Sequence, residues 1–139
     1  MTVTADSRSA VDRTEYAVFL VAVGLIALHV VDDSFLQPQP GTSQADHLVS
    51  GLVLVALLSG AAVVYGRARA GVRATLALLL GFFGVLSGTE AVYYSLSGGP
   101  SGDDFTGFLS TVGGFVLLAL GAMTLWRSRR ADGSRRLLL

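Results

Sequence analysis

The sequence predicts an all-α integral membrane protein in which four membrane-spanning helices form a bundle. Apolar residues make up 52% of the 139 residues and charged residues only 14%, whereas a soluble domain has about 25% charged residues. No Lys or Arg occurs in residues 14–66 or in residues 74–126. Turn signals divide these two runs into four apolar segments of about 20 residues, a length that crosses about 30 Å of hydrocarbon.

The chain therefore divides into a polar tail, four spans and an arginine-rich tail, over residues 1–14, 15–36, 45–66, 72–96, 104–126 and 127–139. Pro38 and Pro40 end the first span, because each lacks an amide donor and fixes its own φ. Ser43 or Asp46 caps the second span. A loop rich in Gly and Ser, residues 97–102, separates the last two spans.

The ten basic residues are all Arg, and they lie in the two tails and around the turn between the second and third spans. By the positive-inside rule, both termini face the cytoplasm, and we expect the protein in the plasma membrane. Tyr65 and Trp126 then mark the inner interface of the bilayer, and Tyr93 and Tyr94 lie near the outer one. The formal net charge of +0 gives no general attraction to nucleic acid. The absence of Cys excludes thiolate metal sites.

The two halves of the chain resemble each other at an offset of 61 residues. The matching pairs are His29 and Glu90, Val31 and Val92, Ser34 and Ser95, Gly60 and Gly121, and Tyr65 and Trp126. A duplication would give a 2+2 parallel repeat with its axis along the membrane normal, and it would bring His29 and Glu90 together across the bundle. Chance is the alternative, because Gly, Ala, Val and Leu recur throughout such a chain.

Small residues recur at helical spacing in the last two spans. Gly84 and Gly88 form a Gly-x-x-x-Gly step, and Ser110 and Gly114 form a similar step. Such steps let the backbones of two helices approach closely, which favours helix association in lipid. Packing within one chain is the simpler interpretation, and a homo-oligomer is the alternative.

Eight ionisable side chains gather at the outer ends of the spans, with no Lys or Arg near them in sequence: His29, Asp32, Asp33, Asp46, His47, Glu90, Asp103 and Asp104. His29 can share a helix face with Asp32 at i+3 or with Asp33 at i+4. Because these two acids diverge by about 100° around the helix, at most one of them faces the bundle. Helix capping accounts for the acids at the helix starts.

His29 and Glu90 lie one to two turns inside their apolar segments, where an ionisable group usually faces a partner or water. One interpretation is structural: His29, an Asp and Glu90 form a hydrogen-bonded knot that holds the first and third spans together. The second is a divalent-cation or proton site formed by His29, Asp33 and Glu90, since imidazole and carboxylate groups suit Zn, Mn or Fe. A metal-dependent intramembrane hydrolase is the third. The sequence has no nucleophile elbow, P-loop, dinucleotide fingerprint or His-Glu-x-x-His motif, so it does not predict an enzyme.

Residues 29–51, HVVDDSFLQPQPGTSQADHLVSG, resemble the N-terminal membrane region of actinobacterial α/β-hydrolase-fold proteins of the dienelactone-hydrolase-like kind. Residues 90–94, EAVYY, and 100–104, PSGDD, are similar to the matching second outer edge. In that family a soluble hydrolase domain follows the spans, whereas this sequence contains no serine elbow or triad. The resemblance therefore implies a membrane module that anchors or serves a hydrolase, and it assigns hydrolase activity to no residue here.

From the sequence we expect a multi-pass membrane module without its own catalytic machinery. Its acidic outer face would bind a partner, either a hydrolase or another membrane protein. A cation- or proton-handling protein centred on His29, Asp33 and Glu90 is the alternative. The lipid bilayer is the other expected partner, and the arginine-rich tail would contact anionic lipid headgroups.

Overall fold

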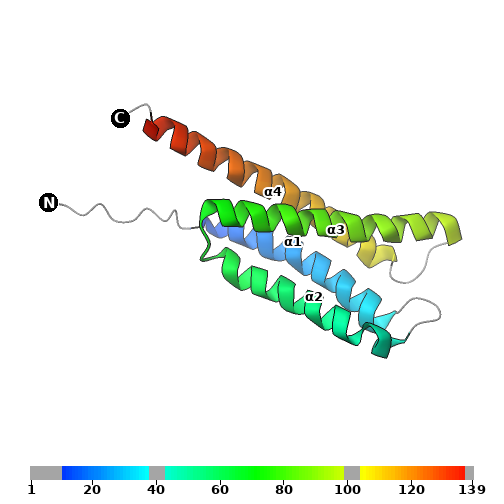
Figure 1. The fold of residues 1–139 in the computed structure, drawn as a ribbon. Helices are drawn as coiled ribbons and strands as arrows, with labels where there is room; N and C mark the ends of the chain where they lie inside the picture. Colours follow the sequence, from blue (N-terminus) through cyan, green and yellow to red (C-terminus); the bar gives the residue numbers. More distant parts are fainter. Residues whose placement is uncertain (1–10, 38–42, 99–103, 137–139) are drawn as a thin grey trace.

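Four long helices account for most of the chain in the computed structural model, which describes residues 11–37, 43–98 and 104–136 (Figure 1). They are α1 (Arg13–Val31), α2 (Gln44–Tyr65), α3 (Ala70–Gly98) and α4 (Asp104–Arg136), with a π-helical turn, η1 (Asp32–Leu36), after α1. All four helices are long and apolar enough to cross a membrane. No strand occurs within the described ranges. The predicted all-α four-helix membrane bundle is confirmed.

The helix boundaries differ from the expected ones mainly in α4. This helix has 33 residues and continues through the arginine-rich segment to Arg136, whereas the sequence analysis ended the span at Trp126. A helix of that length is about 50 Å long, more than the roughly 30 Å of a hydrocarbon core. No proline interrupts the segment after Trp126, so the backbone can keep its helical hydrogen bonds beyond the apolar part.

Side-chain caps fix where the first two helices begin. The carboxylate of Asp12 accepts a hydrogen bond from the amide of Thr14 at 3.1 Å, at the start of α1. At the start of α2, the carboxylate of Asp46 accepts hydrogen bonds from the Ser43 amide at 2.8 Å and from its hydroxyl at 2.7 Å. Ser43 is therefore the N-cap, and Asp46 supports it from inside the first turn.

The tightest packing joins α3 and α4 along a seam of glycines. A Cβ atom on Gly114 would lie 2.5 Å from the amide nitrogen of Val85 and 2.7 Å from the carbonyl oxygen of Gly81. The Ser110 hydroxyl donates to the carbonyl oxygen of Gly84 at 3.1 Å, in the same seam. The small-residue steps of the two spans thus face each other within one chain, as the simpler interpretation predicted.

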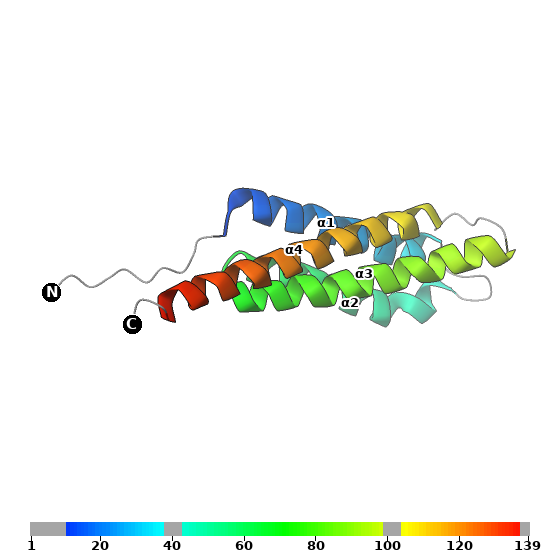
Figure 2. The ribbon, with the colours of Figure 1, turned by 90° about the horizontal axis from the view of Figure 1, so that it is seen from above.

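Helices α1 and α2 pack on one side of the α3–α4 pair. Figure 2 shows α4 between α1 and α3, and α1 packs far more extensively on α4 than on α3. Gly113 of α4 lies against the backbone of Ala22 in α1. Helix α2 packs on α1 and η1, where Gly51 fits against Ser34 and Phe35. The two halves therefore pack differently, with a close α3–α4 pair and a looser α1–α2 pair, and the packing lends no support to a 2+2 repeat.

We expect the glycine seam to set the stability of the fold. A Gly114→Leu substitution inserts a side chain where no space exists, so it should lower the free energy of unfolding by about 1–3 kcal/mol or more. The matched control is Gly60→Leu in α2, because a Cβ at Gly60 meets nothing within 4 Å. Detergent titration of purified protein, followed by circular dichroism, measures both. Equal stability of the two variants would contradict the packing described here.

Candidate functional site

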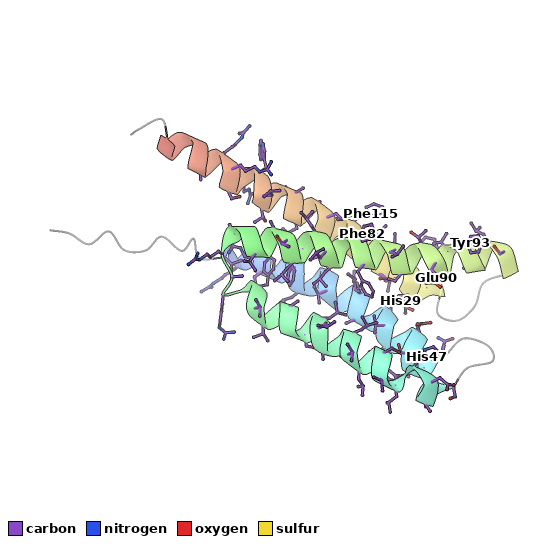
Figure 3. The ribbon with its side chains drawn as sticks, in the orientation of Figure 1. His29, His47, Phe82, Glu90, Tyr93 and Phe115 are labelled. Carbon is purple, nitrogen blue, oxygen red and sulfur yellow. The ribbon has the colours of Figure 1, made fainter. Side chains whose placement is uncertain are left out.

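Polar side chains concentrate at the two ends of the bundle. The arginine end is where α1 begins, α2 meets α3 and α4 finishes, and it carries Arg67, Arg69 and Arg73. The acidic end is the opposite one and carries the predicted site residues (Figure 3). Phe19, Ile26 and Leu117 are fully buried in the apolar core that separates the two ends.

A buried hydrogen-bonded chain joins α1 to α4 at the acidic end. The Thr106 hydroxyl donates to Oδ2 of Asp32 at 2.7 Å, and Thr106 Oγ1 lies 3.3 Å from Nδ1 of His29. A hydroxyl has one hydrogen, and here it is given to Asp32, so His29 donates from Nδ1. The side chain of Gln37 donates to the other oxygen of Asp32 at 3.2 Å. His29 and Asp32 are each only 6% exposed. The predicted knot of His29, an Asp and Glu90 between the first and third spans is replaced by a chain that contains Thr106 instead of Glu90 and joins α1 to α4.

Asp32, and not Asp33, is the acid that faces α4. Asp33 is half-buried, while Asp32 is buried against Thr106 in the first turn of α4. The expectation that at most one of the two acids faces the bundle stays a prediction, because Asp33 is itself half-buried. The acid that shares Thr106 with His29 is thus Asp32, whereas the predicted cation site used Asp33.

Two further residues of the predicted site, Asp46 and His47, lie in the first turn of α2. Asp46 is exposed and serves the α2 cap, and His47 is half-buried in the first turn of the same helix. Asp103 lies outside the described residues, and Asp104 is described only as the first residue of α4.

Glu90 lies on the side of α3 that faces away from α4, and its side chain is exposed. The next residue, Ala91, is buried against Gly107 of α4, and His29 lies beside that contact. No hydrogen bond or ion pair joins Glu90 to another residue in the described part of the chain. No hydrogen bond or ion pair therefore joins Glu90 to His29, and Figure 3 shows the two residues on different helices.

A metal site at the acidic end gains no support from this geometry. No group of three or more His, Cys, Asp or Glu side chains within residues 11–37, 43–98 and 104–136 is arranged to hold a metal ion. The divalent-cation site of His29, Asp33 and Glu90 remains a prediction from sequence.

A second polar cluster, which the sequence analysis missed, lies at the arginine end. The Tyr65 hydroxyl donates to Oε1 of Glu15 at 3.0 Å, and Nε of Arg73 lies 3.5 Å from the same oxygen. The Arg73 and Glu15 side chains are 6% and 13% exposed. Nε of Arg73 makes no hydrogen bond to the described residues, so the pair is held by charge. The signal in the sequence is that all three residues lie at helix ends on the same side of the membrane.

Tyr65 belongs to the core and not to the bilayer interface, which corrects the expectation for this residue. It is 0% exposed and its ring stacks on Phe19, with the ring centroids 3.6 Å apart. The ring of Tyr16 lies nearly parallel to the Tyr65 ring, with the centroids 6.4 Å apart, and the Tyr16 hydroxyl donates to the carbonyl oxygen of Ala62 at 3.0 Å. Trp126 does face outward, 55% exposed, with the Arg130 guanidinium 3.7 Å from its ring centroid.

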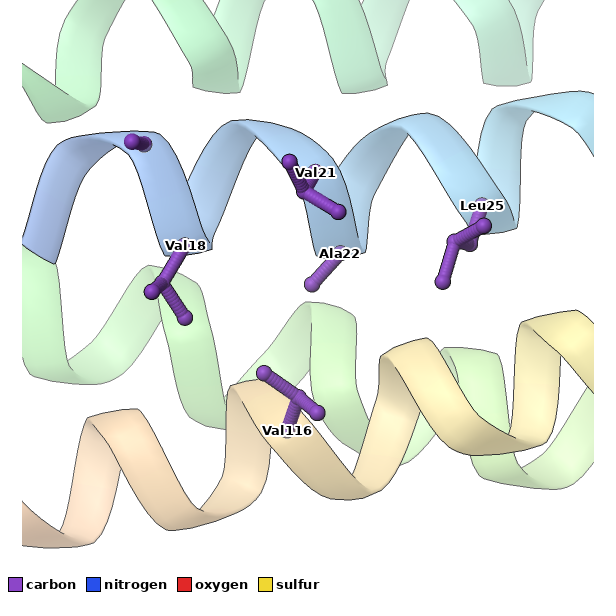
Figure 4. Close-up of a pocket in the computed structure, with 6 residues that line it drawn as sticks. Val18, Val21, Ala22, Leu25 and Val116 are labelled. Carbon is purple, nitrogen blue, oxygen red and sulfur yellow. The ribbon is translucent and has the colours of Figure 1, made fainter. Parts of the chain in front are cut away.

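One shallow groove lies on the surface between α1 and α4 (Figure 4). Its volume is about 260 Å³, and its lining side chains are all apolar: Ala17, Val18, Val21, Ala22, Leu25 and Val116. Such a lining can contact a lipid chain but offers no group for catalysis or ion binding.

Removing the Thr106 hydroxyl should destabilise the acidic end. Thr106→Val keeps the shape of the side chain but leaves His29 and Asp32 without their shared partner, at a cost of about 1–3 kcal/mol of unfolding free energy. Thr106→Ser retains the hydroxyl and should stay close to the wild type. The comparison is made by thermal unfolding in detergent. If Ser and Val variants melt together, the hydrogen-bonded chain contributes nothing to stability.

Breaking the pair at the arginine end should cost more than replacing it. Arg73→Met leaves the Glu15 carboxylate buried without a cation, and we expect a loss of about 3–5 kcal/mol. Adding Glu15→Gln removes the uncompensated charge and should restore part of that loss. A double-mutant cycle of unfolding free energies measures the coupling. Purely additive effects would show that the two side chains do not interact.

Comparison of the sequence with protein-family models, with curated proteins and with solved structures returned no match. The resemblance to the membrane region of hydrolase-fold proteins thus stays a prediction.

Proposed function

We propose that this protein is a multi-pass membrane module that binds a partner membrane protein through the exposed side of α3, which faces away from α4. The binding surface is the α3 stripe, which consists of the exposed residues Leu79, Phe82, Leu86, Glu90 and Tyr93. In this proposal the protein contributes no catalytic machinery of its own.

The single observation that carries the proposal is the position of Glu90 within an apolar surface. Phe82 is 64% exposed, Leu86 59% and Tyr93 66%, so Glu90 lies among large side chains that face lipid. Glu90 is 17 residues from Arg73, which is about 25 Å along the helix axis. A carboxyl group within a membrane span usually pairs with another group or faces the bundle interior. Glu90 does neither among the described residues, so a partner outside the chain accounts for it.

The contrast between Glu90 and the buried ionisable groups supports this assignment. His29 and Asp32 are satisfied through Thr106, and Glu15 is satisfied by Tyr65 and Arg73. Such satisfied groups need no ligand to explain them. The site to test for binding is therefore the α3 stripe and not the internal hydrogen-bonded chain of His29, Thr106 and Asp32.

The predicted topology completes the proposal. With the arginine end in the cytoplasm and the protein in the plasma membrane, the α3 stripe reaches the outer leaflet at Tyr93. The resemblance of residues 29–51 and 90–94 to a hydrolase-associated membrane region makes a membrane-bound α/β-hydrolase-fold protein the first partner to test.

Photo-cross-linking tests whether the stripe has a partner. A benzophenone side chain placed at Phe82 or Tyr93 in native membranes should give a discrete adduct well above 14.5 kDa. The Glu90→Gln variant should weaken that adduct, because it removes the charged group at the centre of the surface.

The matched control places the same probe at Val21, which is 65% exposed on α1. An adduct formed equally from Val21, or none from Phe82 and Tyr93, would contradict the proposal. Mass spectrometry of the adduct identifies the partner and shows whether it contains a hydrolase domain.

A further inference from the structure

We infer that the partner of the α3 stripe is a different membrane protein, with a transmembrane helix that carries a Lys or Arg at the depth of Glu90. This inference rests on the proposed binding role of the stripe and adds the chemistry of the partner. The alternative occupants are a second copy of this chain and a lipid with an amine headgroup, and the experiment below distinguishes them.

The charge distribution of the chain argues against a second copy. No Lys or Arg occurs in residues 14–66 or 74–126, so a copy inserted in the same orientation brings no such cation to the depth of Glu90. Its arginines lie at the opposite end of the bundle. Of its two histidines, His29 is buried against Thr106, and His47 lies on α2, away from the α3 stripe.

A symmetric contact through the stripe would also be unfavourable. A two-fold dimer uses the same patch on both subunits, so it would place one Glu90 close to the other. Two carboxyl groups that share a site repel when both are ionised. The glycine and serine steps that often drive self-association of membrane helices are already occupied in the α3–α4 seam.

The side chains around Glu90 fit a long basic residue. Phe82 and Leu86 lie one to two turns toward the arginine end, and Tyr93 lies one turn toward the acidic end. The methylene stem of a Lys or Arg can cover apolar side chains while its charged head reaches the carboxylate. An aromatic ring beside the carboxylate adds an attraction for a cation.

The test uses a synthetic transmembrane helix of Leu and Ala with one Lys at the depth of Glu90. It is reconstituted with the full-length protein in phosphatidylcholine vesicles, and energy transfer between dyes reports association. The chain has no Cys, so an Ala131→Cys variant carries one dye at the exposed start of the arginine-rich segment.

We expect the Lys helix to bind roughly 3- to 30-fold more tightly than a helix with Leu at that position, as for other polar contacts between membrane helices. A helix with Lys at the cytoplasmic end should bind no better than the Leu helix. Glu90→Gln should remove the preference while unfolding at the same detergent concentration as the wild type. A Ser59→Ala variant on exposed α2 serves as the matched control and should retain the preference.

Three outcomes would overturn the inference. Equal binding of the Lys and Leu helices would show that charge does not select the partner. Stronger association between two labelled copies of the protein than with the Lys helix, lost in Glu90→Gln, would assign the stripe to a second copy. Loss of Lys-helix binding when phosphatidylethanolamine is added would assign Glu90 to an amine headgroup. In the first two cases, cross-links from Phe82 and Tyr93 in native membranes would still support the proposal that the α3 stripe binds a membrane protein. The absence of such cross-links would refute that proposal.

Discussion

The close contact of α3 with α4 determines where the other polar groups can lie. Gly81 and Gly88 must face α4, because a side chain at either of them would collide with its backbone or side chains. A Cβ at Gly84 would lie 2.6 Å from Ile26 of α1 and 3.1 Å from the Cα of Gly114 in α4. Ala91 continues the same face against Gly107. Since successive residues of a helix diverge by about 100°, Glu90 is turned away from the seam. The exposure of the carboxyl group is thus a direct consequence of the glycine packing.

The same contact builds the hydrogen-bonded chain at the acidic end. With α4 held between α3 and α1, its first turn brings Thr106 to His29 and Asp32. The backbone of α1 takes up a π-helical turn at this point, and Gln37 closes it with an amide hydrogen bond to the carbonyl of Asp32 at 2.8 Å. The π-helical turn therefore lies where His29 and Asp32 are buried and hydrogen-bonded. A membrane protein can hold polar groups within an apolar bundle when internal hydrogen bonds satisfy them.

The two ends of the bundle satisfy their buried polar side chains by different interactions. At the arginine end, a charge pair and a tyrosine hydroxyl link α1, α2 and α3 around the Phe19–Tyr65 stack. At the acidic end, uncharged donors satisfy a carboxylate that has no Lys or Arg near it in sequence. Among the described residues, His29, Asp32 and Glu15 have partners within the chain, whereas no hydrogen bond or ion pair joins Glu90 to another side chain. The proposed function follows from this difference between satisfied and unsatisfied groups.

The sequence by itself determined the class of protein, the number of spans and their approximate limits. Those properties depend on the apolar content of each segment and on local turn signals such as Pro38 and Ser43. It also identified His29 and Glu90 as unusual, because an ionisable residue in an apolar run is visible without a structure. The spacing of Gly81, Gly84 and Gly88 even contained the information that Glu90 faces away from that side of α3. The tertiary structure alone decided that α4, and not α3, supplies the partner of His29, and that Asp32 is chosen over Asp33. Thr106, Tyr65 and Arg73 acquire their roles only when helices distant in sequence pack side by side, since hydrogen bonds and ion pairs depend on distances that no local pattern fixes.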